Sequence, residues 1–125
     1  MEPLRALIVE DEPALQDVLQ QVLADDAPAP AVTAVDSALA AGRLARRLRP
    51  DVVLLDLGLP YRSGLALLKE LKADPGTAQI PVVIVSGLAG QLPAEVRALA
   101  DAVIGKPFHI EELRDTVRAV CGRAA

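Results

Sequence analysis

Five short apolar runs lie along the 125-residue chain, and four of them lead directly into Glu10, Asp56, Ser86 or Lys106. The runs are rich in Val, Ile and Leu and lack the polar alternation of half-exposed strands. This pattern predicts parallel strands that are covered by helices on both faces. The runs occupy residues 7–9, 31–35, 52–55, 82–85 and 103–105.

The segments between the runs carry apolar residues at helical spacing. In the first segment the stripe is Leu15, Val18, Leu19, Val22 and Leu23, with Pro13 suited to the first turn. Further stripes predict helices near 37–48, 63–73, 93–99 and 110–120, the second entered at Ser37 and the third capped by Ser63. Five βα units with right-handed crossovers predict a single doubly wound, five-stranded parallel sheet, with two helices on one face and three on the other.

The polar residues at the ends of the runs predict one shared site. Glu10 and Asp11 follow the first run, Asp56 the third, Ser86 the fourth and Lys106 the fifth. The carboxyl ends of parallel strands lie on the same edge of a sheet, and open α/β sheets bind ligands there. We therefore expect these side chains to meet although they are far apart in the sequence.

Three converging carboxylates need a proton or a cation between them, because two such charges about 5 Å apart repel by roughly 3 kcal/mol at an effective dielectric constant near 20. A donor set made only of oxygen favours Mg2+ or Mn2+ over zinc. A carboxylate beside such an ion can act as a nucleophile toward phosphorus. Lys106 and Ser86 offer a positive charge and a hydroxyl group for the oxygens of the transferred group.

Four short motifs occur in order at these positions: Ile8-Val9-Glu10-Asp11-Glu12, Val53-Leu54-Leu55-Asp56-Leu57 followed by Pro60 and Gly64, Val85-Ser86-Gly87, and Lys106-Pro107-Phe108. Each motif alone is weak, but together they span almost the whole chain. In them the chain resembles the receiver domain of bacterial two-component response regulators. The resemblance implies that residues 1–125 form one receiver domain with the (βα)5 flavodoxin-like fold and the strand order 2-1-3-4-5.

The resemblance also implies a role for each motif. Asp56 would accept a phosphoryl group from a phosphohistidine on a sensor histidine kinase or a histidine phosphotransfer protein, and Lys106-Pro107 would be a cis peptide. Mg2+ would be held by Glu10, Asp11, Asp56 and the backbone carbonyl of Gly58, and the phosphoryl group by Ser86 and Lys106. An unknown downstream protein would receive the signal.

Two features depart from the family pattern. Val103 occupies the position, three before Lys106, where the family usually has Tyr or Phe. Ser86 and Lys106 are 20 positions apart, about two fewer than expected. Because the fourth helix and fifth strand are the family's usual output face, we expect signal transmission to be atypical.

Two other functions remain as alternatives. Because Val103 stands where the family usually has an aromatic residue, one alternative is a receiver-like interaction domain that acts independently of phosphorylation. A Mg2+-dependent phosphohydrolase with an aspartyl nucleophile is less favoured, because such enzymes usually carry a second Asp two positions on, where this chain has Gly58. The chain is therefore expected to be a signalling module and not an enzyme.

Composition and charge indicate which partners and which cellular compartment to expect. The 13 basic and 17 acidic residues are interspersed and give a net charge of -4, so we expect no direct contact with nucleic acid. Cys121 is the only cysteine, which excludes an intrachain disulfide and favours a reducing cytoplasm. No apolar run approaches the roughly 20 residues of a membrane span, so no contact with a membrane is expected.

Overall fold

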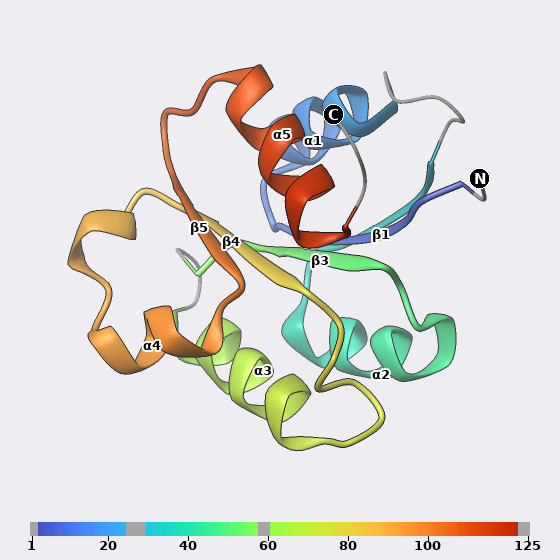
Figure 1. Ribbon diagram of the computed structural model, residues 1–125, viewed down its shortest axis with the longest axis vertical. Coiled ribbons are helices and arrows are strands. Elements are labelled where there is room, and N and C mark those ends of the chain that lie inside the picture. Colours follow the sequence, from blue (N-terminus) through green and yellow to red (C-terminus); the bar gives the residue numbers. More distant parts are fainter. Residues whose placement is uncertain (1–2, 25–29, 58–60, 123–125) are drawn as a thin grey trace.

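The computed structural model describes residues 3–24, 30–57 and 61–122, the last range without the side chains of 61–63. Its centre is a sheet of five parallel strands in the order β2-β1-β3-β4-β5 (Figure 1). The strands are β1 (Arg5–Val9), β2 (Ala31–Val35), β3 (Val52–Leu55), β4 (Val82–Ser86) and β5 (Ala102–Gly105). This confirms the predicted fold class and the strand order that the family resemblance implied.

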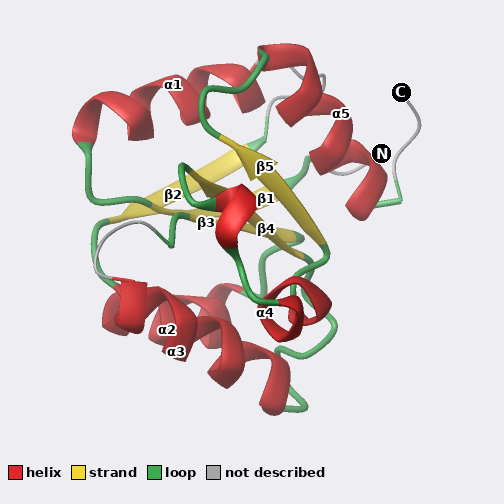
Figure 2. Cartoon of the chain, turned by 90° about the vertical axis from the view of Figure 1, so that its left-hand side faces the viewer, coloured by secondary structure: helices red, strands yellow, loops and turns green. Residues whose placement is uncertain are grey.

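Helices cover both faces of the sheet, as the apolar runs predicted. Figure 2 shows α1 and α5 on one side of the strands and α2, α3 and α4 on the other. Their bounds are α1 (Pro13–Ala24), α2 (Ala38–Leu48), α3 (Tyr61–Ala73), α4 (Ala94–Leu99) and α5 (Ile110–Val120), and a short 3-10 turn, η1 (Ala89–Gln91), precedes α4. Among the residues that the structure describes, no helix has both the length and the apolarity that a membrane crossing requires.

The strands divide the apolar core into two layers. Successive strand residues point to opposite faces, so Leu7 and Leu55 pack with the α2, α3 and α4 layer. Ile8 and Leu54 pack with the α1 and α5 layer. All four side chains are at most 1% exposed, which explains why the strands show no polar alternation.

The ends of the helices show where the sequence pattern succeeded and where it failed. Ser37 caps α2, because its hydroxyl oxygen accepts the backbone N–H of Ala40 at 3.1 Å. Arg49 ends this helix in the left-handed conformation with φ of 46°. The prediction that Ser63 caps the third helix is wrong, because α3 already begins at Tyr61. The apolar stripe of α3 starts later than its first turn and so did not mark the helix start.

The turn after α3 provides a test of how charge contributes to this fold. Asp74 accepts the backbone N–H of Gly76 at 2.9 Å and the Nε–H of Arg46 at 3.1 Å. The Gly76 hydrogen bond and then the Arg46 guanidinium lower the pKa of the Asp74 carboxyl. A carboxyl whose pKa is lower in the folded state stabilises the protein above its unfolded pKa, and this contribution is lost as the pH falls through the folded pKa.

We predict that Asp74→Asn lowers the free energy of unfolding at neutral pH and that its difference from the wild type shrinks in acid. Urea unfolding of both proteins across a pH series measures this difference. A difference that stays constant to the lowest pH would show that the negative charge of Asp74 is not the cause.

Candidate functional site

The pairing of β1 with β3 places the acidic residues side by side. Val9 lies opposite Leu55 in this parallel pair. The next residue of β3, Asp56, donates its backbone N–H to the carbonyl of Val9 at 3.1 Å. Glu10 is anchored in the same way to β2, by a 3.0 Å hydrogen bond from its N–H to the carbonyl of Val35. Sheet hydrogen bonds therefore fix the backbone beneath both carboxylates.

Three carboxylates meet at this edge of the sheet. Glu10, Asp11 and Asp56 each offer one oxygen atom, and these atoms lie within 4.8 Å of one another. Glu10 is 3% exposed, Asp56 is half-buried and Asp11 is exposed. The predicted convergence of these three side chains is confirmed, and it combines one carboxylate in the protein interior with one in water.

Lys106 supplies the opposite charge. Its Nζ atom lies 3.0 Å from Asp56 Oδ2 and 3.4 Å from Glu10 Oε1. The Lys106-Pro107 peptide bond is cis, as the family resemblance implied. The predicted meeting of the lysine with the carboxylates is therefore confirmed.

Ser86 lies at the same edge, at the end of β4, and is fully buried. Its backbone carbonyl accepts the N–H of Lys106 at 3.1 Å, so the two residues are joined through their main chains. Its hydroxyl oxygen accepts the N–H of Leu88 at 3.0 Å. The side chain of Ser86 is thus held by the loop that follows it. Gly58, the remaining residue of the predicted site, lies outside the described residues.

Burial and neighbouring charges shift the titration of two of these groups. Burial raises the pKa of Glu10 to about 7; the negative charge of Asp56 acts in the same direction, while the N–H of Glu12 and the charge of Lys106 oppose it. For Lys106, burial favours a lower pKa, but Asp56 and Glu10 outweigh it and raise the pKa above its usual value. At the buried end of the site, the Glu10 carboxyl group is therefore harder to ionise than usual, whereas Lys106 holds its proton more tightly than usual.

The donor set fits a hard divalent cation. Three carboxylates contribute oxygen atoms only, and Lys106 balances only part of their charge. Small divalent ions such as Mg2+ take carboxylate and carbonyl oxygens and keep several waters, for which the exposed Asp11 leaves the site open. Glu10, Asp11 and Asp56 are therefore the residues that would hold such an ion.

A hollow of about 240 Å³ extends from the carboxylates toward α2. Glu10, Asp11 and Asp56 line one part of it, and Asp36 and Leu39 line another. Asp36 and Leu39 were not among the predicted site residues. Asp36 directly follows the apolar run of β2, so the rule that identified the other acidic residues also applies to it.

Comparison with known proteins identifies the family. The family model of the response regulator receiver domain matches residues 6–118, and the chain belongs to this family. The receiver domain of a sensor histidine kinase from Pseudomonas aeruginosa PAO1, solved with a magnesium ion in its active-site cleft, has a TM-score of 0.85 and 28% sequence identity. The match covers 97% of this chain and 99% of that one.

Curated relatives carry the same domain within longer proteins. The DNA-binding dual master transcriptional regulator RpaA of Synechocystis is 36% identical over 122 residues, which cover 95% of this chain and 49% of that regulator. A protein-glutamate methylesterase/protein-glutamine glutaminase of Anaeromyxobacter dehalogenans is 40% identical over 110 residues, 84% of this chain and 29% of the enzyme. The chain thus spans about half of one relative and less than a third of the other.

We predict that Asp11→Ala weakens Mg2+ binding at least tenfold and leaves the metal-free protein equally stable or up to about 1 kcal/mol more stable. The variant removes one cation ligand and one of three like charges, and the repulsion it relieves is small because Asp11 is exposed. Titration calorimetry with Mg2+ and urea unfolding in EDTA measure the two effects. A clear loss of metal-free stability with unchanged Mg2+ affinity would instead identify Asp11 as a structural cap.

Proposed function

We propose that this chain is a phosphoacceptor module of a two-component phosphorelay and that Asp56 receives the phosphoryl group. The observation that carries this proposal is the Lys106 ammonium group 3.0 Å from Asp56 Oδ2, beside two further carboxylates. A lone strand-end aspartate can serve as a turn cap. An aspartate held among a lysine and two acidic neighbours has the surroundings that phosphoryl transfer requires.

In the proposed reaction the phosphoryl group passes directly from the donor to Asp56. A carboxylate oxygen of Asp56 forms a bond to phosphorus while the phosphorus–nitrogen bond of a phosphohistidine breaks. The electron pair of that bond returns to the imidazole nitrogen, which takes up a proton from water. A sensor histidine kinase or a histidine phosphotransfer protein would present this donor.

The surrounding residues would stabilise the charge that moves with the phosphoryl group. Lys106 places a positive charge beside the accepting oxygen, and the hydroxyl of Ser86 would donate a hydrogen bond. When bound by Glu10, Asp11, Asp56 and the Gly58 carbonyl, Mg2+ would neutralise phosphoryl oxygens. The family membership and the magnesium-bound relative support these roles.

We propose that the domain has no catalytic activity on other substrates. The relatives include both a DNA-binding regulator and an enzyme, and the match covers only part of each. The part common to them is the receiver domain, so the different outputs belong to other parts of those proteins. The expected downstream protein, the absence of direct nucleic-acid or membrane contact, and the cytoplasmic location remain predictions for this chain.

We predict that the wild type gains one phosphoryl group from acetyl phosphate in the presence of Mg2+ and none in EDTA. Asp56→Asn should not be labelled, because the variant lacks the accepting oxygen. Intact mass spectrometry measures the product. Asp51→Asn is the matched control, since Asp51 is exposed and precedes the other end of the same strand. Equal labelling of wild type and Asp56→Asn would disprove the assignment.

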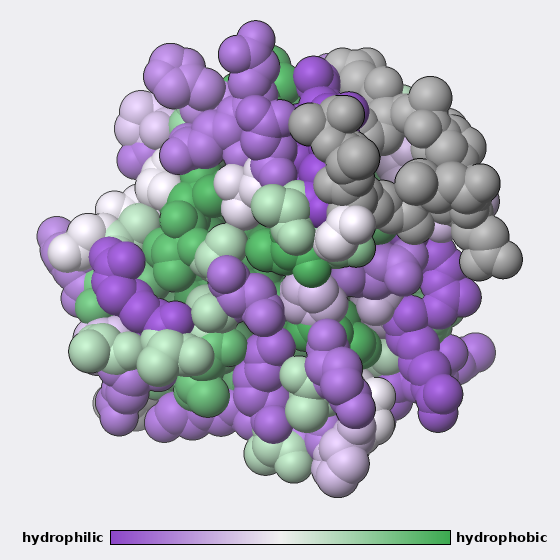
Figure 3. Space-filling model, viewed as in Figure 1, coloured by the Kyte–Doolittle hydropathy of each residue, from purple (hydrophilic) through white to green (hydrophobic). Residues whose placement is uncertain are grey.

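The output side of the domain differs from the family pattern. Val103 lies in the edge strand β5 opposite Ile84 and packs partly buried against the α2, α3 and α4 layer. Figure 3 shows apolar side chains at the surface between α4 and α5, where β5 runs. Valine has one stiff torsion and no ring that could turn between a buried and an exposed position. The usual aromatic coupling element is therefore missing.

Polar contacts also fasten this part of the fold. Asp101, just before β5, accepts the Nζ–H of Lys72 and the backbone N–H of Val82, each at 2.8 Å. Lys72 also donates to the carbonyl of Ile80 at 2.9 Å. These bonds join α3, β4 and the start of β5, so a displacement of β5 would break several contacts together.

We predict that phosphorylation changes residues 93–104 less than the loops that follow Asp56 and Ser86. A population shift requires different contacts in two states, and Val103 offers no large group to supply them. Amide chemical shifts with and without beryllofluoride, a phosphoryl mimic, test this. Asp56→Asn with the same additives is the control. Shifts across 93–104 as large as those beside Asp56 would show that another residue performs the coupling.

A further inference from the structure

A second hollow, of about 340 Å³, lies between α2 and α3, outside the carboxylate site. Its lining residues used below are Leu39, Arg43 and Arg46 from α2, and Ala66, Leu67 and Glu70 from α3. Leu39 also lines the hollow at the carboxylates, so the two depressions adjoin. A partner seated between α2 and α3 would therefore contact the rim of the phosphoacceptor site.

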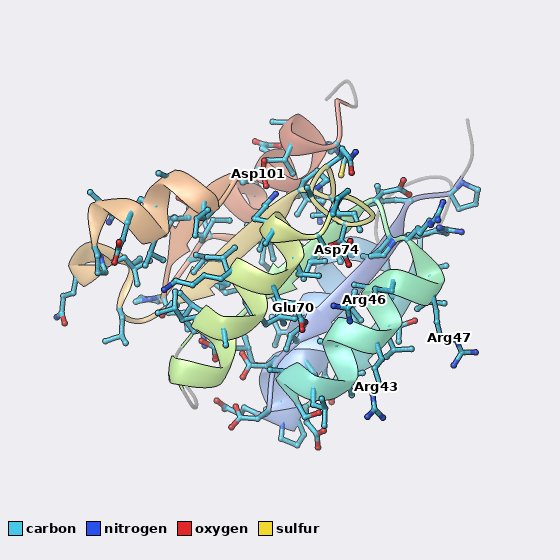
Figure 4. The ribbon with its side chains drawn as sticks, turned by 90° about the horizontal axis from the view of Figure 1, so that it is seen from below. Arg43, Arg46, Arg47, Glu70, Asp74 and Asp101 are labelled. Atoms are coloured by element: carbon cyan, nitrogen blue, oxygen red, sulfur yellow. The ribbon has the colours of Figure 1, made fainter. Side chains whose placement is uncertain are left out.

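The α2 side of this hollow is basic. The helix contains Arg43, Arg46 and Arg47 and no acidic residue, although the whole chain has a net charge of -4. Figure 4 shows Arg46 turned toward α3, whereas Arg43 and Arg47 extend away from it. Within the described part of the chain, neither of these two arginines has a carboxylate within 4.0 Å.

Arg46 is already neutralised. Its guanidinium lies 3.4 Å from Glu70 Oε1 and 3.1 Å from Asp74 Oδ2. Among these three arginines of α2, the positive charge without a carboxylate partner is therefore confined to Arg43 and Arg47.

Apolar surface lies beside this charge. Leu39 is 71% exposed, the highest value among the exposed large apolar residues of the described chain, and it stands one helical turn before Arg43. Ala66 is exposed on the α3 side. The face therefore combines exposed apolar surface with arginine, a residue type that is enriched at protein interfaces.

We propose that the α2–α3 hollow and the adjoining outer face of α2 form a docking surface for a protein segment that presents acidic side chains next to an apolar one. The carboxylates would pair with Arg43 and Arg47, and the apolar side chain would cover Leu39. A second copy of this chain is disfavoured on this face, because Glu70 and Asp74 already pair with Arg46 and so are not available to Arg43 and Arg47 of another copy. Nucleic acid is disfavoured because Arg43 and Arg47 make only a short basic stripe, and the whole chain carries a net charge of -4.

A charge exchange tests the proposal. The probe is a synthetic helix-forming peptide with two Glu residues four positions apart and one Leu on the same face. The matched peptide has Lys in place of both Glu residues. Both are titrated into the 15N-labelled wild type and into the double variant Arg43→Glu with Arg47→Glu. The control variant, Arg97→Glu with Arg118→Glu, changes the net charge by the same amount on α4 and α5.

The Glu peptide should produce saturable amide shifts along 38–48 and 66–70 of the wild type. The α2 double variant should bind the Glu peptide at least tenfold more weakly than the wild type does. The same variant should bind the Lys peptide at least tenfold more tightly than the wild type does. The control variant should bind the Glu peptide like the wild type. Labelling by acetyl phosphate should be unchanged in both variants, which separates this surface from the function proposed for Asp56.

Four results would overturn the proposal: no saturable shifts in the wild type, shifts confined to other helices, equal binding of the Glu and Lys peptides, or equal weakening by the control variant. A random-sequence DNA duplex is titrated in parallel. Saturable shifts on α2 that are tighter with DNA than with the Glu peptide would also overturn it and identify a nucleic-acid surface.

Discussion

The parallel register between β1 and β3 is the constraint on which the site depends. It sets Val9 opposite Leu55, so that the chain leaves both strands at the same level and Glu10 and Asp56 become neighbours. A shift of one residue in either strand would turn its carboxylate toward the opposite face of the sheet. The apolar side chains of both strands are buried in two separate layers, which makes such a shift costly. The core thus maintains the site without contributing a functional group to it.

Electrostatics then gives the site its chemistry. One carboxylate is buried and one is exposed, and Lys106 contacts Asp56 and Glu10 but balances only part of their charge. Burial, together with the negative charge of Asp56, raises the pKa of Glu10. In the proposed function a cation would neutralise the carboxylates, and the phosphoryl group would be held by the lysine and the cation. The excess negative charge of the free site therefore favours the binding of a cation.

The two sides of the site differ in how they connect to the rest of the surface. Toward β5, Asp101 and Lys72 fasten the chain, and Val103 provides no moving ring. Toward α2, the hollow at the carboxylates adjoins a basic and apolar groove through Leu39. The proposed phosphorylation of Asp56 would therefore act next to the α2–α3 face, whereas the side toward the fourth helix is fastened by polar contacts. This asymmetry is consistent with the departures of the chain from its family pattern.

The sequence by itself determined the fold class and the residues at the carboxylate edge, because strand periodicity and strand ends are local features. Apolar runs that end at Glu10, Asp56 and Lys106 can be recognised without knowing which strands are neighbours. Tertiary structure alone decided the distances, the burial of Glu10 beside the exposed Asp11, and the loop hydrogen bond that holds the Ser86 hydroxyl. It also decided the groove between α2 and α3, since a groove arises from the packing of two helices. No local pattern reports such packing, because it depends on residues that are distant in the chain and adjacent only after folding.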